Sequence, residues 1–199
     1  MRARECRHSG ILPRHAILGG HLCLPFSSVP ELEISIVRAR REQLTEVQRL
    51  AGVMWRAHYP GIITHEQIDY MLERGYAIDT LAGFLDASDR GLLLAMVDGD
   101  IAGFAAWYVT EQPDEAKLDK LYVLQSRQRC GLGGRLIARV EDDARTAGAH
   151  TLVLNVNKNN TQAVRAYGKH GFAIRAAVVV DIGQGFVMDD FVMAKDLGT

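Results

Sequence analysis

Cysteine is scarce in this chain, and neither sign of charge predominates. The three cysteines, Cys6, Cys23 and Cys130, are odd in number and lack Cys-x-x-Cys spacing, so they favour neither a disulfide framework nor a zinc site. We therefore expect a protein of the reducing cytoplasm. With 23 Lys and Arg residues against 24 Asp and Glu residues, the formal net charge is -1, which gives no general reason to expect nucleic acid or an anionic membrane as a partner.

Long apolar runs are also missing near the N-terminus. Pro13, Arg14 and His15 interrupt the apolar stretch before the h-region of a signal peptide, of roughly 7 to 15 residues, can form. We interpret residues 1–33 as a disordered or atypical extension, or as the product of an upstream start codon. The histidines show no metal-ligand spacing, so no metal is expected; they include His8, His15, His21, His65, His150 and His170.

The rest of the composition is that of a globular domain. Hydrophobic residues make up 48% of the chain and charged residues 24%. A length of 199 residues suits one domain, given about 100 to 200 residues per domain. No internal repeat or linker is visible, so residues 34–199 are expected to form a single mixed α/β domain.

Hydrophobic periodicity gives the expected elements. Strands are predicted over residues 34–38, 91–97, 101–109, 117–124, 151–156, 173–182 and 186–194. Helices are predicted over residues 42–55, after a capping box at Thr64 and Gln67, over about 79–87, from Leu132 to a cap at Gly148, and from a cap at Asn160 to Gly171. Asp98 and Gly99 supply hairpin turn chemistry between two of the strands.

A glycine-rich loop, residues 128–134, lies between a predicted strand and a predicted helix. Glycines at a helix start let backbone N–H groups face outward, and the helix dipole adds positive charge there, so the loop suits an anion. No Lys-Ser or Lys-Thr follows, which excludes the phosphate loop of nucleoside triphosphatases. Leu136 stands where the dinucleotide fingerprint needs a third glycine. The remaining pattern is Gln-x-x-Gly-x-Gly, formed by Gln128, Gly131 and Gly133.

Residues on both sides of this loop extend the pattern. Asn-x-x-Ala-x-x-x-Tyr followed by Gly-Phe is formed by Asn160, Ala163, Tyr167, Gly171 and Phe172, and residues 118–123 read Leu-Asp-Lys-Leu-Tyr-Val before the loop. Together these motifs resemble the GCN5-related N-acetyltransferase (GNAT) family over residues 117–172. The family usually has glycine at the place of Arg129, which is either a phosphate ligand or a solvated arginine.

The resemblance implies both a fold and a donor substrate. The fold is a mixed, mostly antiparallel twisted sheet with helices on both faces, splayed between its fourth and fifth strands. Acetyl-CoA is the implied co-substrate, without a metal. Its pantetheine arm would pair with the fourth strand, and its pyrophosphate would occupy the loop. The implied cofactor-binding residues are Leu121, Tyr122, Val123, Gln128, Arg129, Gly131, Leu132, Gly133, Gly134 and Asn160.

The resemblance also assigns chemical roles. Tyr167 is the candidate general acid that protonates the leaving thiolate, and the amide of Val123 or a neighbour is the expected oxyanion donor. A primary amine titrates near 10.4, so the acceptor has to lose a proton before it attacks. Asp119 is the candidate for this step, directly or through water. Glu111 and Glu115 are alternatives, and each carboxylate is equally an ordinary surface charge.

The acceptor pocket is expected near Trp55, His58, Tyr59, Asp189 and Asp190. The acidic pair suits a cationic amine, and the segment from Trp55 to Tyr70 resembles polyamine acetyltransferases weakly. We therefore predict a cytoplasmic enzyme that transfers acetyl directly to a primary amine of a small molecule, without nucleic-acid or membrane partners. A homodimer remains open. A non-catalytic acetyl-CoA sensor and a protein lysine or N-terminal acetyltransferase are the alternative functions.

Overall fold

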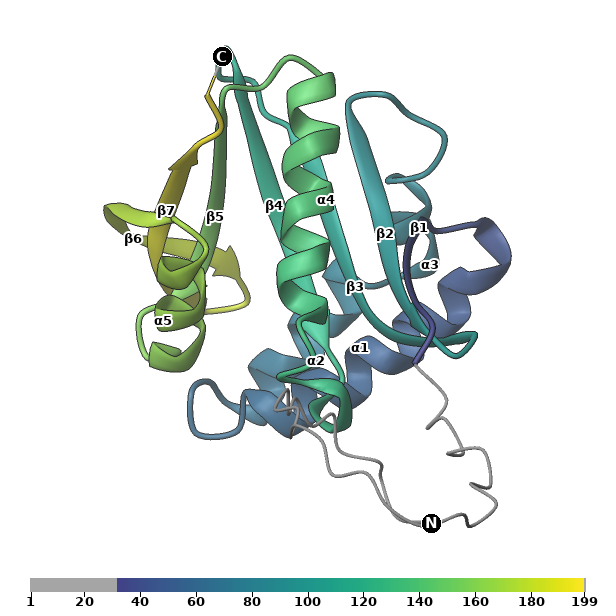
Figure 1. Cartoon of the computed structure of the whole chain (residues 1–199). Helices are drawn as coiled ribbons and strands as arrows, with labels where there is room; N and C mark the ends of the chain where they lie inside the picture. The colour runs from purple at the N-terminus through teal and green to yellow at the C-terminus, as the bar shows by residue number, and fades with distance from the viewer. Residues whose placement is uncertain (1–31, 199) are drawn as a thin grey trace, which may run out of the picture.

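The computed structural model describes residues 32–198, which form one open seven-stranded sheet in the order β1-β2-β3-β4-β5-β7-β6 (Figure 1). The strands are β1 (Ile34–Arg38), β2 (Arg90–Val97), β3 (Asp100–Val109), β4 (Glu115–Val123), β5 (Thr151–Asn157), β6 (Ala173–Gly183) and β7 (Phe186–Asp196). The helices are α1 (Leu44–His58), α2 (His65–Gly75), α3 (Ile78–Ala82), α4 (Leu132–Thr146) and α5 (Thr161–Lys169). Only β4 and β5 pair in parallel, so the expected mostly antiparallel α/β fold is confirmed.

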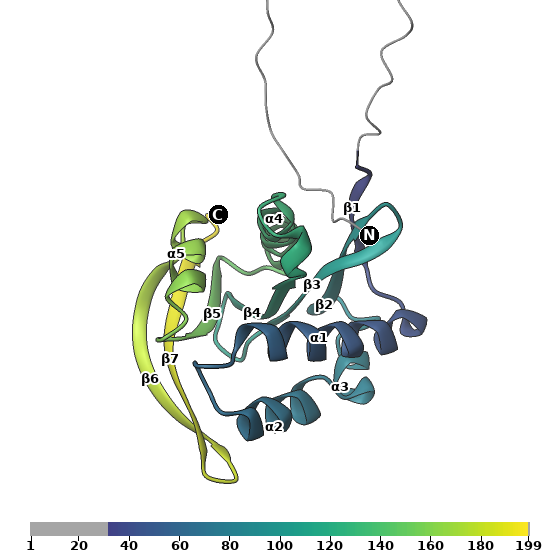
Figure 2. The same ribbon diagram turned by 90° about the horizontal axis from the view of Figure 1, so that it is seen from below.

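Helices cover both faces of the sheet, as Figure 2 shows: α4 and α5 lie on one side, and α1, α2 and α3 on the other. The core is accordingly divided. One cluster packs α4 residues such as Leu136 and Val140 on Leu154 and Trp107 of the sheet. The second cluster packs helix α1 and its neighbours on the opposite face, with Phe104 at its centre. None of the helices between residues 32 and 198 has the length and apolar character needed to span a bilayer.

The sheet opens between β4 and β5. Their pairing is limited to three positions, Glu115 with Thr151, Ala116 with Leu152 and Lys117 with Val153. The rest of each strand continues without the other, so β4 from residue 118 to 123 presents an unpaired edge. This is the predicted splay, and the glycine-rich loop and α4 begin where that edge ends.

Local signals predicted most element boundaries to within a few residues. Asp98 and Gly99 both have positive φ, 52° and 86°, as their hairpin turn requires, and Gly148 and Gly171 have φ of 90° and 89° at the predicted caps. The third helix was predicted too long, because α3 ends at Ala82 and the chain turns from there to β2.

The predicted capping box of α2 is half correct. The Thr64 hydroxyl accepts a hydrogen bond from the backbone N–H of Gln67 at 3.1 Å, which confirms the N-cap. The Gln67 side chain does not complete the box. It donates instead to the carbonyl of Val187 on β7 at 2.8 Å. The Gln67 side chain therefore binds a distant strand and not the N-cap residue that the capping box predicts.

Candidate active site

The glycine-rich loop adopts a backbone that suits glycine at two positions. Gly131, the N-cap of α4, has φ of 79°, and Arg129 has φ of 65°. L side chains reach this left-handed region at a cost of roughly 1 to 2 kcal/mol. The preference for glycine at the place of Arg129 therefore has a conformational reason, and the arginine here is accommodated with strain.

The first turn of α4 has amides available for an anion. Its N-cap is glycine and makes no side-chain cap, so the first N–H groups of the helix, including those of Leu132 and Gly133, lack an intrahelical acceptor. A Cβ at Gly133 would meet nothing within 4 Å, whereas one at Gly134 would lie 2.9 Å from Cε1 of His170. Gly133 thus leaves room at the helix start, and Gly134 permits the close approach of His170, the C-cap residue of α5.

Backbone amides also line the unpaired edge of β4. The N–H of Leu124 donates to Ala102 on β3 at 2.9 Å, and the carbonyl of Tyr122 also faces β3, since it would lie 2.6 Å from a Cβ at Gly103. Because backbone groups alternate in direction along a strand, those of Leu121 and Val123 face the splay. The Gln128 side chain donates to the Val123 carbonyl at 3.3 Å and so ties the loop to this edge.

Helices α1 and α5 meet across the splay. The Oδ1 of Asn160 accepts from the N–H of Ala163 at 3.2 Å and caps α5, which fixes the orientation of the amide. Its Nδ2 then faces Nε2 of His58 at 3.0 Å. Because Nδ2 can only donate, Nε2 of His58 accepts, and the proton of the neutral ring is on Nδ1. The predicted pairing of Asn160 with a ligand would compete with this contact.

Tyr167 lies on α5 at the same crossing. Its ring packs edge-on to Phe172, with centroids 5.8 Å apart, and Tyr59, the C-cap residue of α1, is close enough to act on it electrostatically. Burial, and to a lesser extent Tyr59, raises the pKa of the Tyr167 phenol well above its ordinary value. Within residues 32–198 no group hydrogen-bonds to its hydroxyl, so a protonated phenol remains available there.

Aromatic side chains form the floor beneath α1. Trp55 is 3% exposed, stacks on Tyr59 with centroids 4.3 Å apart, and donates from Nε1 to the Tyr76 hydroxyl at 3.0 Å. The hydroxyls of Tyr59 and Tyr122 are 3.1 Å apart. Burial raises the pKa of Tyr59, Tyr76 and Tyr122, so all three are neutral at pH 7. Trp55 is therefore a core residue with little surface to offer a ligand.

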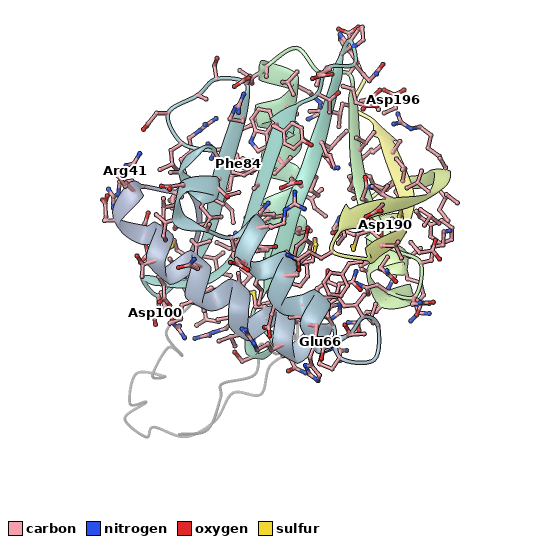
Figure 3. The ribbon with its side chains drawn as sticks, turned by 180° about the vertical axis from the view of Figure 1, so that it is seen from behind. Arg41, Glu66, Phe84, Asp100, Asp190 and Asp196 are labelled. Carbon is pink, nitrogen blue, oxygen red and sulfur yellow. The ribbon has the colours of Figure 1, made fainter. Side chains whose placement is uncertain are left out.

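The two adjacent aspartates of β7 have different environments. Asp189 pairs with Lys158 at the exposed end of β5. Asp190, labelled at the β6–β7 hairpin in Figure 3, is 5% exposed, and its charge acts on Tyr59. Its Oδ1 has no hydrogen-bond partner within the described residues. Burial raises the pKa of Asp190, which Asn155 and Lys117 only partly oppose.

Asp119 lies at an irregularity that the sequence did not predict. Ala106 of β3 pairs with Lys120 and Trp107 pairs with Leu118, so Asp119 is the extra residue of a β-bulge. Its carboxylate pairs with Lys120, which is buried between the rings of Tyr76 and Phe84. The bulge explains why apolar residues change face along β4, with Leu118 in one core cluster and Tyr122 beside the other.

The alternative carboxylates are placed less favourably. Glu115 pairs with Arg175 at 2.6 Å, and Glu111 is an exposed residue in the turn after β3. Metal chemistry also finds no support in the described part of the chain, because no three His, Cys, Asp or Glu side chains of residues 32–198 are grouped to hold an ion.

The β6–β7 hairpin contacts helix α2, which sequence reasoning missed. Tyr70 and Arg74 of α2 donate to the carbonyl of Ile182 at 2.5 and 2.6 Å, and the ring of Phe186 lies 5.3 Å from that of Tyr70. No local signal predicts such contacts, because they join residues more than a hundred positions apart. The described residues thus include helix-start amides that lack an intrahelical acceptor, an unpaired strand edge, a neutral phenol and a buried carboxylate.

Sequence comparisons agree with this arrangement. A model of the acetyltransferase (GNAT) family matches residues 52–172. An uncharacterised N-acetyltransferase of Mycobacterium tuberculosis is 29% identical over 157 residues, which is 77% of this chain and 99% of that protein. Streptothricin acetyltransferase of Streptomyces lavendulae is 34% identical over 88 residues, which is 44% of this chain and 47% of that protein.

Solved structures share the fold. The PaiA N-acetyltransferase of Thermoplasma acidophilum in complex with coenzyme A superposes with a TM-score of 0.70 at 24% identity, covering 82% of this chain and 99% of that one. An acetyltransferase from Salmonella typhimurium, solved with its cofactor acetyl-CoA, gives a TM-score of 0.59 at 19% identity, covering 84% and 95%. The first of these proteins was solved with coenzyme A and the second with acetyl-CoA.

Proposed function

Because this chain belongs to the acetyltransferase (GNAT) family and is an N-acetyltransferase with acetyl-CoA as donor, we propose that its acceptor is the primary amine of a small cationic molecule. The observation that carries this proposal is Asp190. A buried carboxylate with an oxygen left unpaired is costly, by roughly 1 to 3 kcal/mol or more for a charged group. A positively charged acceptor would remove that cost.

The surroundings of Asp190 support a site rather than a structural ion pair. The neighbouring Asp189 already pairs with Lys158, and the groups that act on Asp190 from nearby strands only partly offset its burial. Tyr59 borders it from α1, so the carboxylate has an aromatic neighbour. An ammonium group gains from both kinds of contact, since aromatic faces attract cations.

The acetyl donor, acetyl-CoA, is assigned to the glycine-rich loop and the unpaired edge of β4. The amides of Leu132 and Gly133, with the helix dipole, would hold the pyrophosphate of acetyl-CoA. The edge groups of Leu121 and Val123 would pair with the pantetheine arm as an added strand. Arg129 is within the same loop and supplies positive charge. Acetyl-CoA brings the activated acetyl group, and these residues bind and orient it.

Tyr167 is assigned to the leaving group. A thiol such as cysteine has a pKa of about 8.5, far below that of a phenol whose pKa is raised by burial. Complete proton transfer from the phenol to the thiolate is therefore unfavourable. The pKa difference favours a role in which Tyr167 donates a hydrogen bond to the sulfur as negative charge develops on it. Asp119, whose carboxylate pairs with Lys120, is the candidate to receive the proton of the amine, directly or through water.

The test measures release of the free thiol from acetyl-CoA with amines of matched size that are cationic, neutral or anionic beyond the reacting group. Loss of a charge-assisted hydrogen bond costs about 1.5 to 3 kcal/mol, so Asp190→Asn should raise KM for a cationic amine by roughly 10- to 100-fold. The affinity for acetyl-CoA should stay unchanged. Asp189→Asn is the matched control and should have little effect on either constant.

The other outcomes identify the alternatives. Tight binding of acetyl-CoA without thiol release for any amine would favour a sensor. Release only with peptides that carry a lysine or a free N-terminus would favour a protein acetyltransferase. Equal KM values for wild type and Asp190→Asn would remove Asp190 from acceptor binding.

A further inference from the structure

Three phenol hydroxyls from different elements form one hydrogen-bonded row. Tyr59 and Tyr76 are the C-cap residues of α1 and α2, and Tyr122 belongs to the unpaired part of β4. The hydroxyls of Tyr59 and Tyr122 are 3.1 Å apart, and Tyr122 also forms a side-chain hydrogen bond with Tyr76. Trp55 ends the row, because its Nε1 donates to the Tyr76 hydroxyl at 3.0 Å. The row therefore runs from the buried core to Tyr122 and Tyr59, which are only partly buried.

The indole of Trp55 fixes the direction of this row. An indole N–H can only donate, so the Tyr76 oxygen accepts from it. Tyr76 is 3% exposed, and among residues 32–198 only the Tyr122 hydroxyl remains as a partner for its own hydrogen. A buried donor without an acceptor is costly, so Tyr76 donates to Tyr122, and Tyr122 donates to Tyr59. The hydroxyl hydrogen of Tyr59 is left over, since no group in the described part of the chain accepts it.

Tyr59 is close to groups on both sides of the splay. The C-terminal end of α1 is directed toward the part of the sheet that carries α5 (Figure 2), and His58 contacts the α5 cap Asn160 at 3.0 Å. Tyr59 interacts electrostatically with Tyr167 of α5 and with Asp190 of β7. The proposed function assigns these two residues to the leaving sulfur and to the acceptor amine. The thioester carbonyl lies between sulfur and amine, so a donor close to both residues is placed to reach its oxygen.

We propose that the Tyr59 hydroxyl is a catalytic hydrogen-bond donor to the carbonyl oxygen of the acetyl group, an assignment that rests on the proposed roles of Asp190 and Tyr167. When the amine nitrogen attacks the carbonyl carbon, the carbon–nitrogen bond forms and the π electron pair moves to oxygen. Tyr59 and the edge amide of β4 donate to the resulting oxyanion. The carbonyl then re-forms, the carbon–sulfur bond breaks, and its electron pair leaves with the sulfur.

Tyr59 neither gains nor loses a proton in this step. Burial raises the pKa of its phenol, so the hydroxyl stays protonated while the attacking nitrogen gives its proton to the candidate base Asp119. Tyr122, Tyr76 and Trp55 are positioning residues, because they hold the Tyr59 hydroxyl in one direction before the substrate binds. A donor that is already oriented needs no reorganisation when the charge develops.

Tyr59→Phe tests the contribution of the hydroxyl, because it keeps the ring. The hydrogen bond to the oxyanion strengthens in the transition state, so kcat should fall by about 10²-fold. The KM for the amine and the Kd of acetyl-CoA should stay close to the wild-type values. Tyr108→Phe, on β3, removes a hydroxyl that has no hydrogen bond among residues 32–198, and it should leave kcat unchanged. Thermal melts of both variants check that they are folded.

A dithioester analogue of acetyl-CoA, with sulfur in place of the carbonyl oxygen, tests the contact itself. Such a sulfur is a weaker hydrogen-bond acceptor than oxygen, so wild type should use the analogue poorly. The ratio of kcat with the thioester to kcat with the dithioester should be at least about tenfold smaller for Tyr59→Phe than for wild type. An equal ratio, or an unchanged kcat for Tyr59→Phe, would overturn the proposal.

A double-mutant cycle tests the row. Tyr76→Phe alone should lower kcat at least about twofold, and it should have no further effect in the Tyr59→Phe background. The same factor in both backgrounds would show that Tyr76 supports the fold and does not orient Tyr59. All rates are measured with the amine that wild type acetylates fastest. The thioester ratio can therefore fail when Asp190→Asn raises the KM for the amine, and it can hold when Asp190→Asn has no effect.

Discussion

Tyr167 carries the clearest prediction at the scale of single residues. Its phenol is held neutral by burial, so its contribution does not depend on pH in the neutral range. We expect Tyr167→Phe to lower kcat by about 10²-fold or more, within the usual range for an acid catalyst, with less effect on the Kd of acetyl-CoA. Near pH 10, the kcat of wild type and the kcat of the variant should depend on pH in the same way. Steady-state rates across pH, with titration calorimetry for the Kd, measure both; an unchanged kcat would contradict the assignment.

Asp190 predicts an unusual dependence of stability on pH. Because its pKa is raised in the folded state, its contribution to stability is fully present below the unfolded value, about 3.9 for an aspartate, and is lost as pH rises through the folded value. Asp190→Asn should therefore melt at a higher temperature than wild type at pH 7 to 8, and the difference should shrink as the pH falls toward 4. Calorimetric melting curves measure this. A variant that is less stable than wild type at pH 7 would show that the carboxylate is paired.

Substitutions at Arg129 distinguish the effect of backbone strain on stability from the effect of phosphate binding on KM. With φ of 65° it adopts a conformation that glycine reaches more easily, so Arg129→Gly should stabilise the fold by about 1 kcal/mol. That corresponds to a melting temperature about 2 to 4 °C higher for a chain of this size. The KM for acetyl-CoA rises only if the guanidinium contacts phosphate. Arg129→Lys keeps charge and Cβ and is the control; a lower melting temperature for Arg129→Gly would refute the strain.

At the scale of elements, the end of β4 depends on its neighbour β3. Gly103 leaves no room for a side chain, because a Cβ would lie 2.6 Å from the Tyr122 carbonyl and 3.2 Å from Cα of Val123. Gly103→Ala should destabilise the fold by roughly 1 to 3 kcal/mol and weaken acetyl-CoA binding by displacing the edge amides. Gly75→Ala, with open space around its Cβ, is the matched control. Thermal melts and binding titrations of both variants measure the effect; equal melting temperatures would contradict it.

Elements were predictable where local chemistry decides them. The cap at Asn160, the turn at Asp98 and Gly99, and the positive φ of Gly171 follow from residues within four positions of each other. The bulge at Asp119 was not predictable, because it depends on the pairing of β4 with β3. The Gln67 side chain shows the same limit, since its partner Val187 lies on a distant strand.

At the scale of the whole molecule, the weak point is the splay. Between β4 and β5 themselves only three ladder positions pair, and the other contacts across the splay join side chains, such as His58 with Asn160 and Arg175 with Glu115. A ligand that contacts both sides should therefore stabilise the fold strongly. Coenzyme A at about 100 times its Kd contributes about 2.7 kcal/mol, which is roughly 5 to 10 °C in melting temperature.

A fragment of the coenzyme provides the control. ADP carries the pyrophosphate without the pantetheine arm, so it should occupy the cradle but not the edge of β4, and raise the melting temperature less at the same concentration. Differential scanning calorimetry measures both shifts. Equal shifts for the two ligands would show that the arm makes no contribution across the splay.

The sequence by itself determined the family, the order of the elements, the anion cradle and the caps. These features depend on the spacing of residues along the chain, which can be read directly from the sequence. It also named the acidic pair on the last strand but could not separate its members. The tertiary structure decided that Asp189 pairs with Lys158 while Asp190 is buried and acts on Tyr59, and that Trp55 is buried in the core. Burial and pairing depend on which faces meet, and only the packing of helices on the twisted sheet settles that.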